Sequence, residues 1–363
     1  MQKNTEKMQN KPAHKDNCGT GILFSKNNTS NHSIIIRSIL SLNNMKHRGA
    51  VSHDGETPDG CGILLDLDTN FFQKIMLDEQ KLILPSHFGI GVFFVNNGLD
   101  FLNILEQICH DHDIDIIALR QLKLDKKLLG EVAKKTCPKI YHLFVKPKTG
   151  NEERLEINLY KIKKLLDKKF NPEKELYCVS FSSETIVYKG LVQPKYFSKF
   201  YKDLSDPDHK SASAVFHIRF STNTSPKWYL AQPYRVLAHN GEINTISGNR
   251  NWAQARTKIF SSKKLGNLTA YEPLIGQSGS DSSSLDHILD LFTNGGINIG
   301  RAARMLIPPS WQNTDLMDAD EKAFHEYNSM HMEAWDGPAF VCYQSKLYAA
   351  CFLDRNVLTP ARI

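Results

Sequence analysis

The stretch CGTGILF, residues Cys18–Phe24, is the first part of the chain with the pattern of a folded segment. A run of small residues that includes Gly19 and Gly21 leads into three apolar residues, which predicts a β-strand. Residues 1–17 are polar, include four lysines and contain no apolar segment of the kind found in secretory signals. We therefore expect structure to begin at Cys18, after an unstructured tail.

Two later strands are predicted to carry polar side chains. Ala214–Phe220 alternates with period two, which places His217 and Arg219 on the face opposite its phenylalanines and isoleucine. Val236–His239 is predicted as a short strand that ends at the tight-turn pair Asn240-Gly241. The candidate functional residues Arg219, Asn240 and Gly241 are therefore expected at the ends of these two strands.

Helical periodicity dominates other parts of the chain. Asp281 begins a segment whose apolar residues recur at helical spacing, and Gly295-Gly296 is expected to end that helix. Residues 99–172 are rich in lysine and in helical patterns, without a motif that indicates chemistry. We interpret this stretch as a helix-rich insertion or subdomain.

Composition and charge are those of an ordinary globular protein. The chain has 363 residues, with 45 lysines and arginines against 39 acidic residues, for a formal charge of +6. No run approaches the roughly 18 consecutive apolar residues of a membrane span. The basic segments Lys123–Lys139 and Lys161–Lys169 contain interspersed acidic residues, so solvated helix faces are expected and a nucleic-acid partner is not. Seven cysteines without a Cys-x-x-Cys pair disfavour a disulfide framework or a metal site and fit a reducing cytoplasm.

Cys18 is the first candidate for chemistry, because the glycines beside it permit close approach of a substrate. A thiol with an ordinary pKa of about 8.5 is a weak nucleophile at neutral pH unless a base assists it. If Cys18 were the first residue of the mature chain, its own α-amino group could accept the thiol proton. The alternative is that Cys18 is one of several structural cysteines.

Three further segments offer groups that acyl transfer from an amide requires. Asn240 and Gly241 can supply a side-chain NH₂ and a backbone N–H to an oxyanion, or they simply close a hairpin. Arg219 can hold a carboxylate with two hydrogen bonds, or it makes a surface ion pair. Asp281 can accept hydrogen bonds from an ammonium group, or it caps the helix that follows it. The residues alone leave each choice open.

Eight short motifs occur along the chain in a fixed order. They are DNCGTG at 16–21, MKHRGA at 45–50, DGCG at 59–62, HIRFSTNT at 217–224, LAHNGEINT at 237–245, SGSDSSS at 278–284, NSMHME at 328–333 and WDGPA at 335–339. Together they resemble the class II glutamine amidotransferase domain of glutamate synthase, over residues 16–362. The two long central motifs favour glutamate synthase over other members of the class.

The resemblance implies an α+β fold, a four-layer α-β-β-α sandwich of the N-terminal-nucleophile hydrolase type. Residues 18–363 would form one glutamine amidotransferase type 2 domain, with the insertion at about 99–172. This domain would be truncated at its C-terminal end relative to the family. Residues 1–17 would be a propeptide or tail that is removed on maturation.

The resemblance also implies roles for individual residues. Cys18 would attack the side-chain amide of L-glutamine, with its own α-amino group as the base, and water would hydrolyse the thioester to glutamate. Asn240 and Gly241 match the oxyanion-hole positions. Arg219 matches the position that holds the substrate α-carboxylate and Asp281 the one that holds its α-ammonium group, with Thr222 nearby.

The implied activity is the glutaminase part of glutamate synthase, whose ammonia serves the reductive amination of 2-oxoglutarate. This segment is expected to hold no cofactor and no metal, because FMN and a 3Fe-4S cluster belong to the other synthase domains. The expected partners are L-glutamine and the remaining synthase domains or a small subunit, without nucleic acid or membrane. The expected location is the cytoplasm, with a plastid as the alternative.

Several features differ from the family's pattern. The chain ends at Ile363, so it is much shorter than a glutamate synthase large chain. Val357 and Thr359 stand where the family usually has Gly and Arg, and Pro58 stands where a Gly is common. A β-branched residue at a turn glycine costs on the order of 1 kcal/mol or more. A non-catalytic remnant or docking module of glutamate synthase, or a hydrolase of another amide, therefore stay as alternatives.

Overall fold

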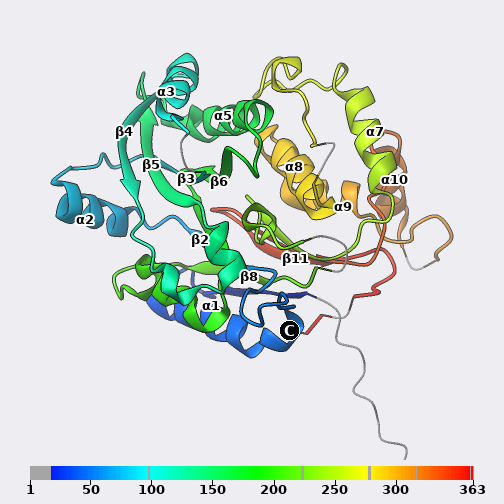
Figure 1. The fold of residues 1–363 in the computed structure, drawn as a ribbon. Helices are drawn as coiled ribbons and strands as arrows, with labels where there is room; N and C mark the ends of the chain where they lie inside the picture. The colour runs from blue at the N-terminus through cyan, green and yellow to red at the C-terminus, as the bar shows by residue number, and fades with distance from the viewer. Residues whose placement is uncertain are drawn as a thin grey trace, which may run out of the picture.

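The computed structural model describes residues 18–96, 99–221, 225–276, 279–315, 317–359 and 361–362. Within them the chain is a mixed α/β protein with three antiparallel sheets, which Figure 1 shows with helices on their outer sides. No helix of the described part is long and apolar enough to cross a membrane.

The first sheet contains the strand that follows Cys18. Its strand order is β1 (Gly19–Phe24), β8 (Ser213–Ile218), β2 (Cys61–Asp66) and β7 (Thr185–Gly190). Helix α1 (His32–Asn44) packs against β1, β8 and β2. All six residues of β8 are buried, on both of its faces, so the predicted alternation describes two buried faces and not an inner and an outer one.

The second sheet lies against the first and has the order β11 (Ala349–Leu353), β10 (Ala339–Gln344) and β9 (Leu237–Gly241). Strands β9 and β10 contact both β1 and β8, and helix α8 (Asp281–Asn294) contacts β9 from the other side. Figure 1 shows α1, β8, β11 and α8 in that order across the molecule. The second sheet is thus placed between the first sheet and α8.

The third sheet joins β4 (Ile114–Gln121), β5 (Lys139–Pro147), β3 (Gly89–Val95) and β6 (Leu176–Ser182) in that order. Strands β4 and β5 fall inside residues 99–172, where the sequence predicted helices without noting strands. The same stretch also holds α3 (Leu102–Asp111), α4 (Glu131–Lys135) and α5 (Leu155–Lys169). Periodicity alone does not distinguish a short apolar strand from a segment of a buried helix, which is why the sequence did not reveal β4 and β5.

The remaining α-helices connect and cover these sheets. They are α2 (Thr69–Gln80), α6 (Phe197–Phe200), α7 (Ile246–Arg256), α9 (Ile299–Leu306) and α10 (Ala319–Ser329). Helix α8 begins as expected at Asp281, and the Ser280 side chain caps it by accepting a hydrogen bond from the Ser283 N–H at 3.1 Å. It ends at Asn294, next to the predicted Gly295.

The lysine-rich segment Lys161–Lys169 does not form a purely solvated helix face. In α5, Lys163 and Lys164 are buried, at 4% and 2% exposure. The Lys163 ammonium group forms an ion pair with Asp290, and that of Lys164 donates to the Leu274 carbonyl at 3.0 Å. The expectation was wrong for these two residues, because tertiary partners on and before α8 satisfy their charges.

The turn after β11 confirms that position 357 requires an unusual backbone conformation. Val357 has a φ of 52°, in the left-handed region that a β-branched residue rarely adopts. The Asp354 carboxylate accepts backbone hydrogen bonds from Asn356, Leu358 and Thr359, which hold the turn in place. The turn therefore keeps its shape with a residue that strains it.

Candidate active site

Cys18 stands immediately before β1, at the edge strand of the first sheet. Gly19 pairs with Ile218 across the β1–β8 ladder, which places Cys18 beside the residues that follow β8. The Phe220 N–H donates to the Cys18 sulfur at 3.2 Å. Antiparallel register therefore brings the candidate nucleophile to the segment that carries Arg219, 201 positions away in the chain.

The thiol of Cys18 is only partly exposed, and its surroundings act on its pKa in opposite directions. Burial raises the pKa, whereas the Phe220 N–H and the positive charge of Arg219 lower it, and the net direction is upward. A base near the sulfur would therefore be needed to form the thiolate at neutral pH.

A turn before β2 holds the Arg219 segment. The Gly60 carbonyl accepts a hydrogen bond from the Arg219 N–H at 2.8 Å, and the buried Asp59 carboxylate accepts one from the Ser221 N–H. Gly60 has a φ of +120°, which only glycine adopts without strain. The sequence showed Asp59-Gly60 only as part of the motif DGCG and did not reveal that these residues support the Arg219 segment.

Asn240 and Gly241 form the end of β9 and not a hairpin turn. Both pair with β10, Asn240 opposite Phe340 and Gly241 opposite Ala339. This register corrects the prediction of a tight turn at these two residues. Gly241 has a φ of +148°, and a Cβ there would lie 1.8 Å from the Pro338 carbonyl oxygen. Close packing against the start of β10 thus requires glycine at this position.

Asp281 does not cap its own helix, because Ser280 performs that role. Its carboxylate accepts a hydrogen bond from the Ile243 N–H at 2.8 Å, two residues after Gly241. His239 lies 3.8 Å from the same carboxylate, and its Nδ1 is 2.8 Å from the Ser282 hydroxyl. Asp281 is thereby joined to the end of β9.

The structure brings the described candidates to two adjoining places. Cys18 and Arg219 lie at one end of the β1–β8 pair, whereas Asn240 and Gly241 lie at the end of β9 together with Asp281. Strand β9 contacts both β1 and β8. The remaining candidate, Thr222, lies outside the described residues.

Two buried histidines near these groups are neutral at physiological pH. Burial and the nearby charge of Arg219 lower the pKa of His217 to about 3. Burial also lowers the pKa of His239, against the opposite influence of Asp281. Neither imidazole is therefore suited to act as a general base that cycles near neutral pH.

The sequence did not reveal the residues that position the start of α8. The Arg250 guanidinium donates to the Gly279 carbonyl at 3.0 Å and to the Ser284 hydroxyl at 3.0 Å. The Tyr234 hydroxyl is 2.7 Å from the hydroxyl of the capping Ser280. These contacts link residues at least 29 positions apart, so no local pattern could have shown them.

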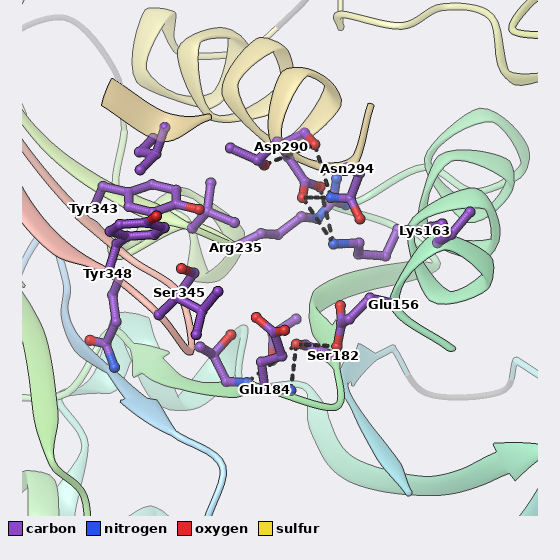
Figure 2. Close-up of a pocket in the computed structure, with 18 of the residues that line it drawn as sticks. Glu156, Lys163, Ser182, Glu184, Arg235, Asp290, Asn294, Tyr343, Ser345 and Tyr348 are labelled. Carbon is purple, nitrogen blue, oxygen red and sulfur yellow. Dashed lines mark hydrogen bonds and ion pairs between the residues drawn. The ribbon is translucent and has the colours of Figure 1, made fainter. Parts of the chain in front are cut away.

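A polar cavity of about 350 Å³ lies elsewhere, between α5, β6 and α8 (Figure 2). Lys163 on α5 lies 3.0 Å from the Asp290 carboxylate, which also accepts a hydrogen bond from Asn294 at 2.8 Å. Glu156 accepts a hydrogen bond from the Ser182 hydroxyl at 2.8 Å. None of the described candidate residues lines this cavity, so it is separate from the candidate active site.

The candidate site is composed of a thiol, a guanidinium group, a carboxylate, a side-chain amide and backbone N–H groups. These groups suit acyl transfer from an amide. Among the described residues, no three His, Cys, Asp or Glu side chains are grouped so that they could hold a metal ion.

Comparisons with known proteins identify a family that this chain matches. A family model described as glutamine amidotransferases class-II matches residues 18–363. The ferredoxin-dependent glutamate synthase of Cyanidium caldarium is 36% identical over 360 residues, which cover 96% of this chain and 23% of that protein. The glutamate synthase [NADPH] large chain of Bacillus subtilis is 36% identical, with the same two shares, over 357 residues. The glutamate synthase [NADH] of Saccharomyces cerevisiae is 35% identical over 365 residues, 17% of its length. The chain thus spans less than a quarter of these relatives.

Proposed function

This chain belongs to the class II glutamine amidotransferases, with the domain found in glutamate synthases, and we propose that it hydrolyses L-glutamine to glutamate and ammonia through a thioester on Cys18. The observation that carries the proposal is the contact between the Cys18 sulfur and the Phe220 N–H, at 3.2 Å. This contact unites the two motifs that contain the proposed nucleophile and Arg219.

The proposed reaction begins after removal of residues 1–17, which gives Cys18 a free α-amino group. That amine accepts the thiol proton while the sulfur attacks the side-chain amide carbon of glutamine. The same proton passes to the departing ammonia, and water then hydrolyses the thioester. The upward shift of the Cys18 pKa supports the need for such a base, and the neutral histidines nearby do not supply one.

The other groups bind the substrate and stabilise developing charge. The side-chain amide of Asn240 and the N–H of Gly241 donate to the oxyanion of the tetrahedral intermediate. Arg219 holds the α-carboxylate of glutamine and Asp281 its α-ammonium group, with Thr222 beside them. The contacts that support Asp281 in this role are the Ile243 N–H and a neutral His239, neither of which neutralises its charge.

We further propose that the layers α1, first sheet, second sheet and α8 constitute the four-layer sandwich of N-terminal-nucleophile hydrolases. The packing of α1 on β8 and of α8 on β9 supports this arrangement. In a whole glutamate synthase, the ammonia would aminate 2-oxoglutarate on other domains, which would also carry FMN and a 3Fe-4S cluster. Residues 18–363 would act as one domain with those domains as partners.

The decisive experiment compares processed wild type with Cys18→Ala in a glutaminase assay that measures glutamate. Loss of the nucleophile is expected to lower kcat at least about 10³-fold. The matched control is Cys351→Ala, which removes an exposed cysteine from another sheet and should leave kcat unchanged. Equal activity in Cys18→Ala and wild type would refute the mechanism.

Intact mass of the purified chain separates this enzyme from a non-catalytic docking module. A chain that retains residues 1–17 has its Cys18 nitrogen in a peptide bond, so it should be inactive. The processed chain should be active. An active chain whose mass includes residues 1–17 would show that the α-amino group is not the base.

A further inference from the structure

Two cysteines far from Cys18 lie directly opposite each other in the second sheet. The β10–β11 ladder pairs Cys342 with Cys351, and their sulfur atoms are 3.0 Å apart. Both are free thiols. The nine-residue separation in sequence matches no motif, so only the strand register brings these thiols together.

Strand geometry allows a bond between them. Directly opposite residues of antiparallel strands have Cα atoms about 4.5–5.5 Å apart. This range lies within the roughly 4.4–6.8 Å that disulfides span, so the backbone need not move far. A shift of about 1 Å in the side chains would bring the sulfur atoms to bonding distance, about 2.05 Å.

The two thiols differ in exposure and in acidity. Cys342 is buried, whereas Cys351 is exposed. The hydrogen bond between them lowers the pKa of the Cys351 thiol and raises that of Cys342. Cys351 is therefore the thiol that reacts first with a molecule from solution, and Cys342 is placed to react second.

A cavity of about 590 Å³ opens beside Cys351 and indicates which molecules can reach it. Apolar side chains of α9 and β11 form much of its wall, and Arg304 and Arg355 also line it. Among the described residues of the wall, Asp354 alone is acidic, and its carboxylate accepts hydrogen bonds from backbone N–H groups of the following turn. The cavity thus favours an anionic reactant of moderate size.

We propose that Cys342 and Cys351 form a reversible disulfide by exchange with an anionic small-molecule disulfide of the glutathione type. The Cys351 thiolate attacks one sulfur of that disulfide, which breaks the S–S bond and releases one glutathione thiolate. The Cys342 sulfur then attacks the Cys351 sulfur of the mixed disulfide and releases the second glutathione. The two protein thiols lose two electrons and two protons, and the reagent is reduced to two thiols.

The bond would connect the edge strand β11 to the centre of the second sheet. Cys342 also lies opposite Ala238 on β9, two residues before Asn240. Oxidation would therefore stabilise the sheet that carries the proposed oxyanion residues, without involving Cys18. The proposal does not depend on the glutaminase mechanism.

The test uses the full chain with Cys18→Ala, so that the other partly exposed thiol cannot react. The Cys18→Ala chain has six of the seven natural thiols, and incubation with oxidised glutathione should leave four of them free. The product should show a mass loss of two hydrogens and a crosslinked peptide that contains both Cys342 and Cys351. Reduction should restore both thiols. A stable glutathione adduct on Cys351, a crosslink to another cysteine, or no reaction would overturn the proposal.

Single variants assign the order of the two steps. Cys342→Ser should stop at a glutathione adduct on Cys351, whereas Cys351→Ser should not react. An adduct at Cys342 in the Cys351→Ser chain would contradict the order. Arg304→Gln with Arg355→Gln should slow the reaction with glutathione disulfide several-fold, but not the reaction with the neutral hydroxyethyl disulfide. Equal slowing with both reagents would show that charge does not select the reactant.

Discussion

The Cys18 region and the cavity between α5 and α8 both bury polar groups, but they satisfy them in different ways. In the cavity, side chains neutralise each other, as in the ion pair between Lys163 and Asp290. In the Cys18 region, backbone N–H groups are hydrogen-bond donors instead: that of Phe220 donates to the sulfur, and that of Ile243 donates to the Asp281 carboxylate. Backbone donors hold a thiol or carboxylate in place without adding a neutralising charge. Substitutions should therefore lower stability in the cavity and activity in the Cys18 region.

The largest effect is expected from Lys163→Met in the cavity. The variant leaves the Asp290 carboxylate, 2% exposed, with Asn294 as a hydrogen-bond partner but without its cation. Breaking such a buried pair should lower the free energy of unfolding by about 3–5 kcal/mol. Urea denaturation measures the change.

A double variant provides the control for that experiment. Lys163→Met with Asp290→Leu removes both charges and should recover much of the lost stability, because no unpaired carboxylate remains buried. Glutaminase kcat per folded molecule should stay near wild type in both proteins. If either variant had a lower kcat without a loss of stability, the cavity would contribute to activity, and the proposed difference between the two regions would be wrong.

Asn240→Ala, in the Cys18 region, should lower the activity and not the stability of the protein. Removal of one oxyanion donor typically lowers kcat about 10²–10³-fold, which corresponds to about 2.7–4 kcal/mol. Steady-state kinetics should show this loss in kcat with little change in KM. The matched control is Asn294→Ala in the cavity, which should keep its kcat. Similar kcat values for the two alanine variants would contradict the proposed role of Asn240.

Asp286 on α8 is a buried carboxyl group near the cavity whose pKa is raised. Burial and the neighbouring Asp290 raise its pKa to about 6, although Arg235 and Lys163 oppose the shift. Its Oδ1 accepts a hydrogen bond from the Val236 N–H at 3.0 Å, and the buried Lys189 also faces its charge. This carboxyl group therefore keeps its proton in the folded state at pH values where the unfolded chain has lost it.

Stability linked to Asp286 should decrease as pH rises. Below about pH 4 both states bind the proton; between about 4 and 6 only the folded state does, so the unfolding free energy falls by at most about 3 kcal/mol. Asp286→Asn removes this dependence. Urea denaturation of both proteins at pH 4 and pH 6 should show a smaller difference in the variant. An identical pH dependence would mean that Asp286 ionises normally.

Sequence patterns predicted well those parts of the molecule whose structure is determined by residues close to them in the chain. Strand β1 and the start of α8 depend on apolar spacing and turn residues that neighbours in the chain supply. The solvated face expected at Lys163 and Lys164 was wrong because partners on and before α8 decide their environment. The hairpin turn expected at Asn240-Gly241 was wrong because β10, almost a hundred residues later, pairs with both.

Family, candidate nucleophile and the order of the functional motifs could all be read from the chain, because these properties are linear and need no knowledge of contacts. The structure alone decided that Phe220 contacts Cys18, that Asp281 is held by Ile243, and that Cys342 faces Cys351. Each of these contacts depends on strand register or on packing between distant segments, and a shift of one residue in register would change the partner. Long-range pairing is a property of the whole folded chain.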